Sequence, residues 1–343
     1  MPIPTPLLFR GAPGSPYTRK MLALLRYRRI PHRLIIGRHQ ATDGLPQPKV
    51  ALLPTFFLPN ERGELEAVVD STPLIRRFET QFSGRGVIPT DPVTAFIDYL
   101  LEDYADEWLT KAMFHYRWYY PADIERAGDI LPRWTAISAP ETQMQKSKTF
   151  IQQRQIERLY VVGSNDTTAP VIEASYRRFL EIFKRLLEQQ PFLLGARPGA
   201  ADFGAYGQLT QLAHFDPTPM ALTLAEAPRV YAWVDITDDL SGLEINENDW
   251  LPRDAIKALL GDLLTEVGRV YAPFMRANAE TLRRRAAEVT LSIDGKPWVQ
   301  QPFPYQGKCL QWLREQHAAL SNTDRSTVDA ILSGTGCEVL FAH

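Results

Sequence analysis

Residues 7–26 constrain the fold more than any other stretch of this chain. Residues 7–10 have the apolar character of a short strand, and residues 11–14 form a tight, glycine-containing loop. A helical pattern follows, and its apolar positions are Met21, Leu24 and Leu25. The order predicts strand, loop and helix, the first part of an α/β unit.

Ser15 and Pro16 lie where that helix should begin. Serine is a favoured N-cap, and proline costs nothing at the first helical position because its missing N–H would be unpaired there anyway. A helix N-terminus carries about half a positive charge. A hydroxyl and unpaired N–H groups would therefore face one spot, where a phosphate, carboxylate or thiolate is stabilised. An ordinary capped helix explains the same residues.

Composition limits the other possibilities. The chain has 343 residues, 45% of them hydrophobic, and its 38 basic and 40 acidic residues give a net charge of −2. This balance provides no general attraction to nucleic acid or to an anionic membrane. No stretch approaches the ~18 apolar residues of a membrane span, and the N-terminus lacks a signal-peptide pattern. We expect a cytoplasmic protein.

Cys309 and Cys337 are the only two cysteines, and neither has a CxxC or metal-ligand spacing. We expect both to be free thiols, and we expect no metal. Because the first three hundred residues contain no cysteine, thiol chemistry beside Ser15 would need sulfur from outside the protein.

Further elements follow in the order of a small mixed sheet. Residues 33–36 read as a second strand, parallel to the first by the crossover rule. Residues 50–58 are apolar and interrupted by Pro54, which predicts either an edge strand or a cis peptide after Leu53. Residues 59–64 predict a hairpin turn and residues 65–69 its return strand. A helix should then start with Thr72 as N-cap.

Three motifs in this region resemble those of the cytosolic glutathione transferases. They are the SPY sequence of residues 15–17, the Leu53-Pro54 step and the Asp70-Ser71 pair. The resemblance implies a thioredoxin-like, glutathione-binding domain over residues 1–84 and an all-helical substrate domain over residues 93–250. The expected fold class is thus α/β plus all-α, with a C-terminal extension over residues 251–343.

The helical half carries a second resemblance. Residues 192–211 are similar to the buried capping motif that begins a central helix in the family, but Gly199 replaces the usual Ser or Thr cap. Glycine is an acceptable N-cap, and Asp202 can still accept from the Gly199 N–H. The motif therefore survives the replacement.

The extension should be packed rather than loose, because it contains aromatic residues that can bury area. They are Trp298, Phe303, Tyr305 and Trp312. The sequence predicts helices from Pro252 with a break at Pro273, and a hairpin that turns at Asp294-Gly295. A short helix should lie around Leu310, and a strand should end at Phe341.

The resemblance implies that Ser15 activates glutathione. Its thiol has a reference pKa of about 8.5, so a useful site must lower this value by about two units, which takes about 2.7 kcal/mol. A hydroxyl donated to a charged acceptor supplies about 1.5–3 kcal/mol and a helix N-terminus about 0.3–1. Phe9 stands where other classes carry a catalytic tyrosine, and Tyr17 remains a second donor.

The remaining glutathione contacts are implied in the same way. A cis Pro54 would turn the Leu53 N–H and C=O toward the cysteinyl part of the peptide. Asp70 suits the γ-glutamyl ammonium, and Ser71 suits its carboxylate, unless both residues only cap a helix. The glycyl carboxylate needs a donor, and the choice is open among Arg38, His39, Gln40 and Lys49.

The second substrate should lie against a long helix over residues 93–119. We interpret its acidic residues chiefly as a solvated face with Glu107 and Lys111 paired, and its aromatic residues as core. A polar pocket is the alternative for this unusual mixture of residues, which comprises Asp103, Asp106, Trp108, His115, Arg117 and Trp118. A metal site is disfavoured, because the spacing of Asp106 and His115 does not place them on one face.

Two functional hypotheses follow. The first is a glutathione transferase-like enzyme that adds the thiolate to an electrophile, with Ser15 stabilising the thiolate. The second is a non-catalytic member that binds glutathione or a protein partner. Disulfide or dehydroascorbate reduction would need Cys337 to fold back to the cleft. The family resemblance also implies a homodimer, although the extension could block the pairing surface.

Overall fold

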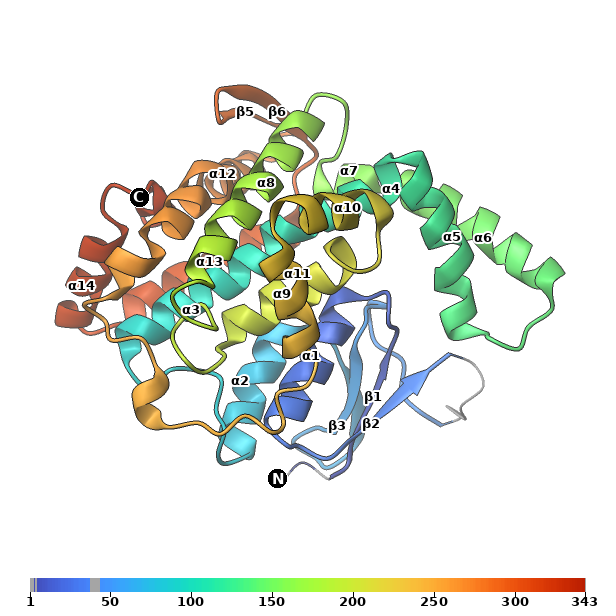
Figure 1. Ribbon diagram of the computed structural model, residues 1–343, viewed down its shortest axis with the longest axis horizontal. Helices are drawn as coiled ribbons and strands as arrows, with labels where there is room; N and C mark the ends of the chain where they lie inside the picture. Colours follow the sequence, from blue (N-terminus) through green and yellow to red (C-terminus); the bar gives the residue numbers. More distant parts are fainter. Residues whose placement is uncertain (1–2, 4, 38–43, 343) are drawn as a thin grey trace.

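A four-stranded mixed sheet begins the molecule (Figure 1). The structure is a computed structural model that describes residue 3 and residues 5–37 and 44–342. The strands are β1 (Leu7–Gly11), β2 (His32–Ile36), β3 (Thr55–Pro59) and β4 (Leu65–Val68). Their order is β2-β1-β3-β4, with β1 parallel to β2 and antiparallel to β3, as the sequence predicts for the first two strands. Phe9 of β1 stacks on Phe56 of β3 in the core.

Two helices lie beside this sheet, α1 (Pro16–Tyr27) and α2 (Ser71–Gln81). The start of α1 confirms the prediction from Ser15 and Pro16. The start of α2 corrects one: the helix begins at Ser71, with Asp70 rather than Thr72 in the N-cap position. Asp70 has a φ of 84°, which turns the chain into the helix earlier than the Thr-Pro signal indicated.

A long helical rod follows, made of α3 (Pro92–Tyr104), η1 (Ala105–Leu109) and α4 (Thr110–Tyr119). The middle segment η1 is a π-helix, a form that often occurs at functional sites. The remaining helices of this part are α5 (Pro121–Thr135), α6 (Glu141–Ile156), α7 (Leu159–Val162), α8 (Ala169–Leu186), α9 (Ala200–Leu212), α10 (Pro217–Glu226), α11 (Pro228–Thr237) and η2 (Glu247–Asp249). Helices α5 and α6 project from the body as a hairpin (Figure 1).

Helix α9 is buried along its whole length and packs against α1. A Cβ atom added to Gly207 would lie 2.6 Å from the Pro16 carbonyl oxygen. This glycine therefore lets the central helix approach the start of α1 closely. The expected cap is present, because Asp202 accepts from the Gly199 N–H at 2.9 Å.

The extension consists of α12 (Ile256–Arg284), β5 (Val289–Ile293), β6 (Lys296–Gln300), α13 (Pro304–Ala319), α14 (Asn322–Leu332) and η3 (Cys337–Leu340). The hairpin at Asp294-Gly295 is confirmed. Two expectations are wrong. Helix α12 continues through Pro273, since burial of the flanking residues outweighs one lost backbone bond. The chain before Phe341 is a 3₁₀ turn after Gly336, whose φ of 90° prevents an extended approach.

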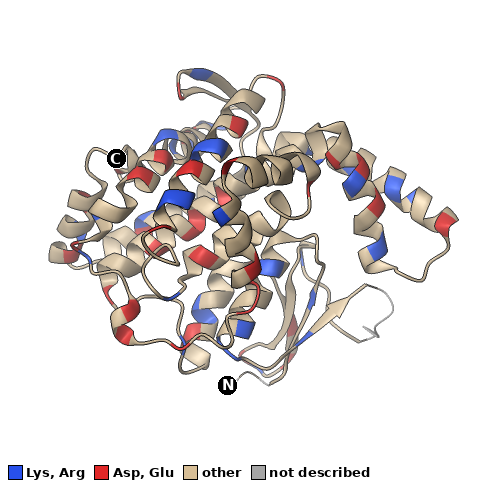
Figure 2. Cartoon of the chain, viewed as in Figure 1, with Lys and Arg blue, Asp and Glu red and all other residues tan. Residues whose placement is uncertain are grey.

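The extension shares one hydrophobic core with the rest of the chain, so it is packed as predicted. Helix α12 packs along α8, and α13 and α14 pack on α3. Positive and negative side chains are interspersed over the helices (Figure 2). Among the described residues, no helix is long and apolar enough to cross a membrane. Together these elements form an α/β domain joined to a helical bundle and a packed C-terminal extension.

Candidate functional site

Ser15 lies at the N-terminus of α1 and faces the start of β3. Its Oγ accepts from the Thr18 N–H at 3.2 Å, which is a side-chain N-cap, and it donates to the Leu53 carbonyl at 3.3 Å. Ser15 as a whole is half-buried. Ser15 therefore does more than cap α1, because its hydroxyl also donates a hydrogen bond to the segment that precedes β3.

The loop before Ser15 is held by side chains from three helices. Arg117 donates to the Gly14 carbonyl at 2.9 Å and is fixed by an ion pair with Asp216. Arg19 and Gln211 both donate to the Pro13 carbonyl at 3.2 Å. Arg117, His115 and Asp103 each have different partners, so the polar pocket remains a prediction. The Arg117 guanidinium positions the backbone that places the serine.

Leu53 and Pro54 are joined by a cis peptide bond, so the cis alternative is confirmed. Pro54 is buried and Leu53 is half-buried. The Leu53 carbonyl points to the Ser15 hydroxyl, which brings two of the predicted site residues together. A backbone polar group at this position can pair with an extended peptide.

Asp70 and Ser71 lie at the start of α2. Asp70 is in the N-cap position, where its carbonyl accepts from the Leu74 N–H at 3.4 Å, and its Oδ2 accepts from the Tyr305 hydroxyl at 2.8 Å. The Ser71 Oγ accepts from the Lys20 ammonium at 3.1 Å. The two side chains therefore do more than cap α2, because they connect it to other parts of the fold.

Lys20 is buried and links the N-terminal domain to the long rod. Its Nζ lies 2.8 Å from Glu102 Oε1 and 2.5 Å from Asp106 Oδ2. Arg76 pairs with the other oxygen of Glu102 at 2.8 Å. Burial opposes ionisation, but these two cations outweigh it and hold the pKa of Glu102 near 2.

The other acids of the rod are buried too, which corrects the expected solvated face. Burial raises the pKa of Asp106 to about 6, that of Asp103 to about 7 and that of Glu107 to about 8. Lys111 is buried and donates to Gln300 and the Val162 carbonyl rather than pairing with Glu107. The extension packs over this face of the helix. The sequence of the helix alone could not predict that contact.

Tyr17 faces the π-helix. Its hydroxyl donates to the Asp106 carbonyl at 2.7 Å, so its proton is already engaged. His115 lies against Ser164 and Glu173, at 2.8 and 3.3 Å, and not beside Asp106. Among the described residues, no group of three or more His, Cys, Asp and Glu side chains could hold a metal ion.

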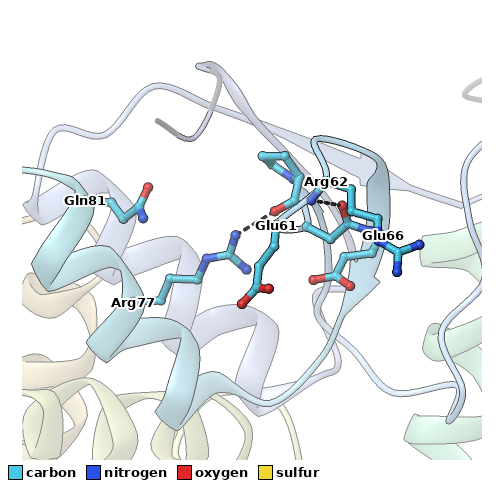
Figure 3. Close-up of a pocket in the computed structure, with 7 residues that line it drawn as sticks. Glu61, Arg62, Glu66, Arg77 and Gln81 are labelled. Atoms are coloured by element: carbon cyan, nitrogen blue, oxygen red, sulfur yellow. Dashed lines mark hydrogen bonds between the residues drawn. The ribbon is translucent and has the colours of Figure 1, made fainter. Parts of the chain in front are cut away.

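The candidate donors for a glycyl carboxylate are only partly described. Arg38, His39 and Gln40 lie outside the described residues, and Lys49 is exposed. A groove of about 590 Å³ lies between the β3–β4 turn and α2, with Glu61, Arg62 and Arg77 on its walls (Figure 3). It contains none of the predicted site residues. We therefore keep the candidate site at Ser15.

Both cysteines are buried. Cys337 donates to the Leu264 carbonyl at 3.2 Å on α12, so it does not fold back to Ser15. Burial raises the pKa of Cys337 to about 12 and raises that of Cys309 as well. Both thiols are therefore protonated at neutral pH, which makes them poor nucleophiles.

Two residues of this region were missed by the sequence reasoning. Lys20 lies one turn before Leu24, on the face that should be apolar, and a charge there signals a buried partner. Tyr305 was noted as an aromatic residue, but its contact with Asp70 spans 235 positions and has no local signal.

The fold and the site define a class of protein. A thioredoxin-like domain is joined to a helical bundle, and within the first domain the capped N-terminus of α1 faces a segment with a cis-proline. Residues 9–86 match the model of the glutathione S-transferase N-terminal domain, and residues 153–235 match that of its C-terminal domain. The chain therefore contains regions similar to both domains of the glutathione S-transferases, in the same order along the sequence.

Several solved structures are similar at low identity. A GST-like protein from Pseudomonas syringae is 16% identical, with a TM-score of 0.39, over 67% of this chain and 66% of that one. A glutathione S-transferase from Rhodospirillum rubrum F11 is 15% identical, with a TM-score of 0.41, over 73% and 98%. One from Methylobacterium radiotolerans, in complex with glutathione sulfonate, is 16% identical, with a TM-score of 0.38, over 72% and 94%. No curated protein sequence matches significantly.

Proposed function

We propose that this chain is a glutathione transferase that adds the glutathione thiolate to an electrophile. In this proposal residues 1–84 bind glutathione, residues 93–250 hold the second substrate, and residues 251–343 complete the fold. The thiolate sulfur attacks an electrophilic carbon, the leaving group departs with its bonding electrons, and the thiol proton goes to solvent. The matches to both glutathione S-transferase domain models support this reaction class.

The observation that carries the proposal is the position of Ser15. Its hydroxyl caps α1 and donates to the Leu53 carbonyl, which is the group expected to pair with the cysteinyl N–H of glutathione. When that carbonyl accepts from the peptide, the serine proton is free to turn to the sulfur. A charge-assisted bond of about 1.5–3 kcal/mol, with the helix N-terminus, then favours the thiolate.

The other contacts extend along the same cleft. Leu53, presented by Pro54, would hold the cysteinyl backbone. Asp70 would bind the γ-glutamyl ammonium and Ser71 its carboxylate. Lys20 supports the role of Ser71, because the Lys20 ammonium donates to Ser71 Oγ and leaves the Ser71 hydroxyl proton to be donated to the ligand carboxylate. Tyr17, whose hydroxyl is engaged by Asp106, would contribute its ring to the wall.

The test is turnover of glutathione with a generic aryl halide. Ser15→Ala should lower kcat/KM by roughly tenfold to a hundredfold, since it removes one charge-assisted hydrogen bond. Ser321→Ala is a matched control, because Ser321 is the N-cap of α14 and accepts from the Asp324 N–H. Its loss costs a similar cap, about 1 kcal/mol of stability, without touching the cleft.

A non-catalytic member of the same fold is the second candidate. The bond from Tyr305 to Asp70 favours it, because this predicted ligand already has a partner within the chain. Turnover absent from the wild-type protein, with glutathione still bound, would favour this candidate.

Assembly as a homodimer and a cytoplasmic location also belong to this proposal. The extension limits which surfaces are available for the dimer. Because α12 covers α8 and α13 covers part of α3, a pairing of two chains must use the surface that these helices leave free.

A further inference from the structure

The first turn of α13 reaches back to the N-terminal domain. Tyr305 lies in that turn, and its hydroxyl donates to Asp70 Oδ2 at 2.8 Å. Both residues are half-buried, so the contact is partly exposed and does not lie in the core. The extension therefore touches one of the residues proposed to bind the peptide.

The conformation of Asp70 makes this contact informative. Its φ of 84° and ψ of 109° form a strained combination for a residue other than glycine. Such a conformation persists only where the surroundings hold it. The first turn of α2 holds the Asp70 backbone, because the Asp70 carbonyl accepts from the Leu74 N–H at 3.4 Å. The carboxylate is oriented by the Thr72 N–H and, from the extension, by the Tyr305 hydroxyl.

The contact leaves acceptor capacity for a ligand. A carboxylate offers about four acceptor positions, and the phenol occupies one of them. Burial raises the pKa of Asp70, while the Tyr305 hydrogen bond and the Lys20 charge act to lower it. The phenol thus favours the ionised form, which is the form that attracts an ammonium group.

We propose that Tyr305 is a positioning residue, through which the extension aims Asp70 at the α-ammonium group of a γ-glutamyl peptide. The inference rests on the proposed function, because it assigns the γ-glutamyl end to Asp70. In this proposal the extension makes the protein selective for peptides that carry a free α-ammonium group. Removing the phenol oxygen should therefore weaken selectivity for that group more than it weakens binding of the rest of the peptide.

Calorimetry with two ligands tests this inference on the full chain. The ligands are glutathione and its N-acetyl derivative, which lacks the ammonium charge. For the wild-type protein we expect a clear preference for glutathione. Tyr305→Phe should weaken glutathione binding by about tenfold and leave the acetylated peptide within about twofold, so the preference collapses.

Two further variants make the test specific. Tyr119→Phe is the matched control, because the Tyr119 hydroxyl also donates to a carboxylate, Asp166, at 2.8 Å at an exposed site. It should bind both ligands like the wild-type protein. Asp70→Asn should lose the preference as Tyr305→Phe does, and asparagine tolerates a positive φ. This variant keeps the test valid if Tyr305→Phe does not fold.

The outcomes separate the claims. Equal weakening of both ligands by Tyr305→Phe would indicate a merely structural contact and overturn the inference. Unchanged or tighter glutathione binding would do the same, since it would mean that α13 only covers Asp70. If the wild-type protein binds neither ligand, the proposed function fails, and this inference fails with it.

Discussion

Gly199 shows how one residue depends on another far away in sequence. A Cβ atom at this position would lie 2.3 Å from Asp98 Oδ1, so a Ser or Thr cap does not fit. Asp98 instead accepts from the Ala201 N–H at 3.0 Å. A carboxylate on α3 thus satisfies a donor at the start of α9 that a local cap would normally take.

This exchange predicts strong coupling between the two positions. Gly199→Ser alone should destabilise the fold by about 1–3 kcal/mol through overpacking. Asp98→Ala alone should cost about 1–3 kcal/mol by leaving the Ala201 N–H unpaired. In the double variant the serine can take over the cap, so the loss should be at least about 1 kcal/mol smaller than the sum. Urea unfolding of the four proteins measures this, and additive losses would contradict it.

The residues of the site differ in how far the sequence predicts them. Ser15 and Pro16 are residue types that favour the start of a helix, and a proline after Leu53 allows a cis peptide bond. Both features were therefore predictable from local sequence. Asp70 was predictable as a candidate but not as a partner of Tyr305. That contact depends on how the extension packs, which no local pattern encodes.

Buried acidic residues concentrate at the end of α3 and in the π-helix η1 that follows it. Burial, reinforced by the charge of Asp103, raises the pKa of Glu107 to about 8, and burial raises that of Asp103 to about 7. The folded-state pKa values lie above those of the unfolded chain, so the folded protein binds more protons between about pH 4 and 8. These two groups make the free energy of unfolding fall as pH rises through this window, and the lowered pKa of buried Lys111, about 7, opposes the fall above pH 7.

Urea unfolding between pH 5 and pH 8 measures that slope. Each group contributes up to about 1.4 kcal/mol per pH unit where only the folded form is protonated. Glu107→Gln should flatten the slope above pH 6, whereas Glu157→Gln, at an exposed position, should not. A stability that rises from pH 5 to pH 8 would contradict the assignment.

The hairpin β5–β6 fixes the extension through Trp298. This side chain is fully buried and packs against Trp108 and Phe274, with the Lys111 ammonium 4.0 Å from the Phe274 ring centroid. Trp298→Ala should lower the free energy of unfolding by about 3–5 kcal/mol. Trp312→Ala, at a half-buried position, should cost less than half as much. Equal losses would contradict the packing described.

Helices and strands that are bounded by turn or capping residues were predicted from the sequence. Features that depend on packing against distant segments were not. The Asp294-Gly295 turn needs positive φ angles that these residues tolerate, so the hairpin could be read from the sequence. Pro273 looked like a break, but its neighbours on α12 are buried against other helices. The π-helix has no sequence signature that separates it from an ordinary helix.

At the scale of the whole molecule, the open question is assembly. The proposed homodimer has twice the chain mass of 39.0 kDa, about 78 kDa. Sedimentation equilibrium should give this mass. A mass of one chain would contradict the dimer and would indicate that the extension replaces a second subunit in covering α3 and α8.

The central claim concerns the ionisation of a bound thiol beside Ser15. Ultraviolet absorption of the thiolate, followed as a pH titration of bound glutathione, gives that pKa directly. The account predicts a value about two units below the free thiol in the wild-type protein and a return toward about 8.5 in Ser15→Ala, with Ser321→Ala unchanged. Equal thiol pKa values in the wild-type protein and Ser15→Ala would contradict it.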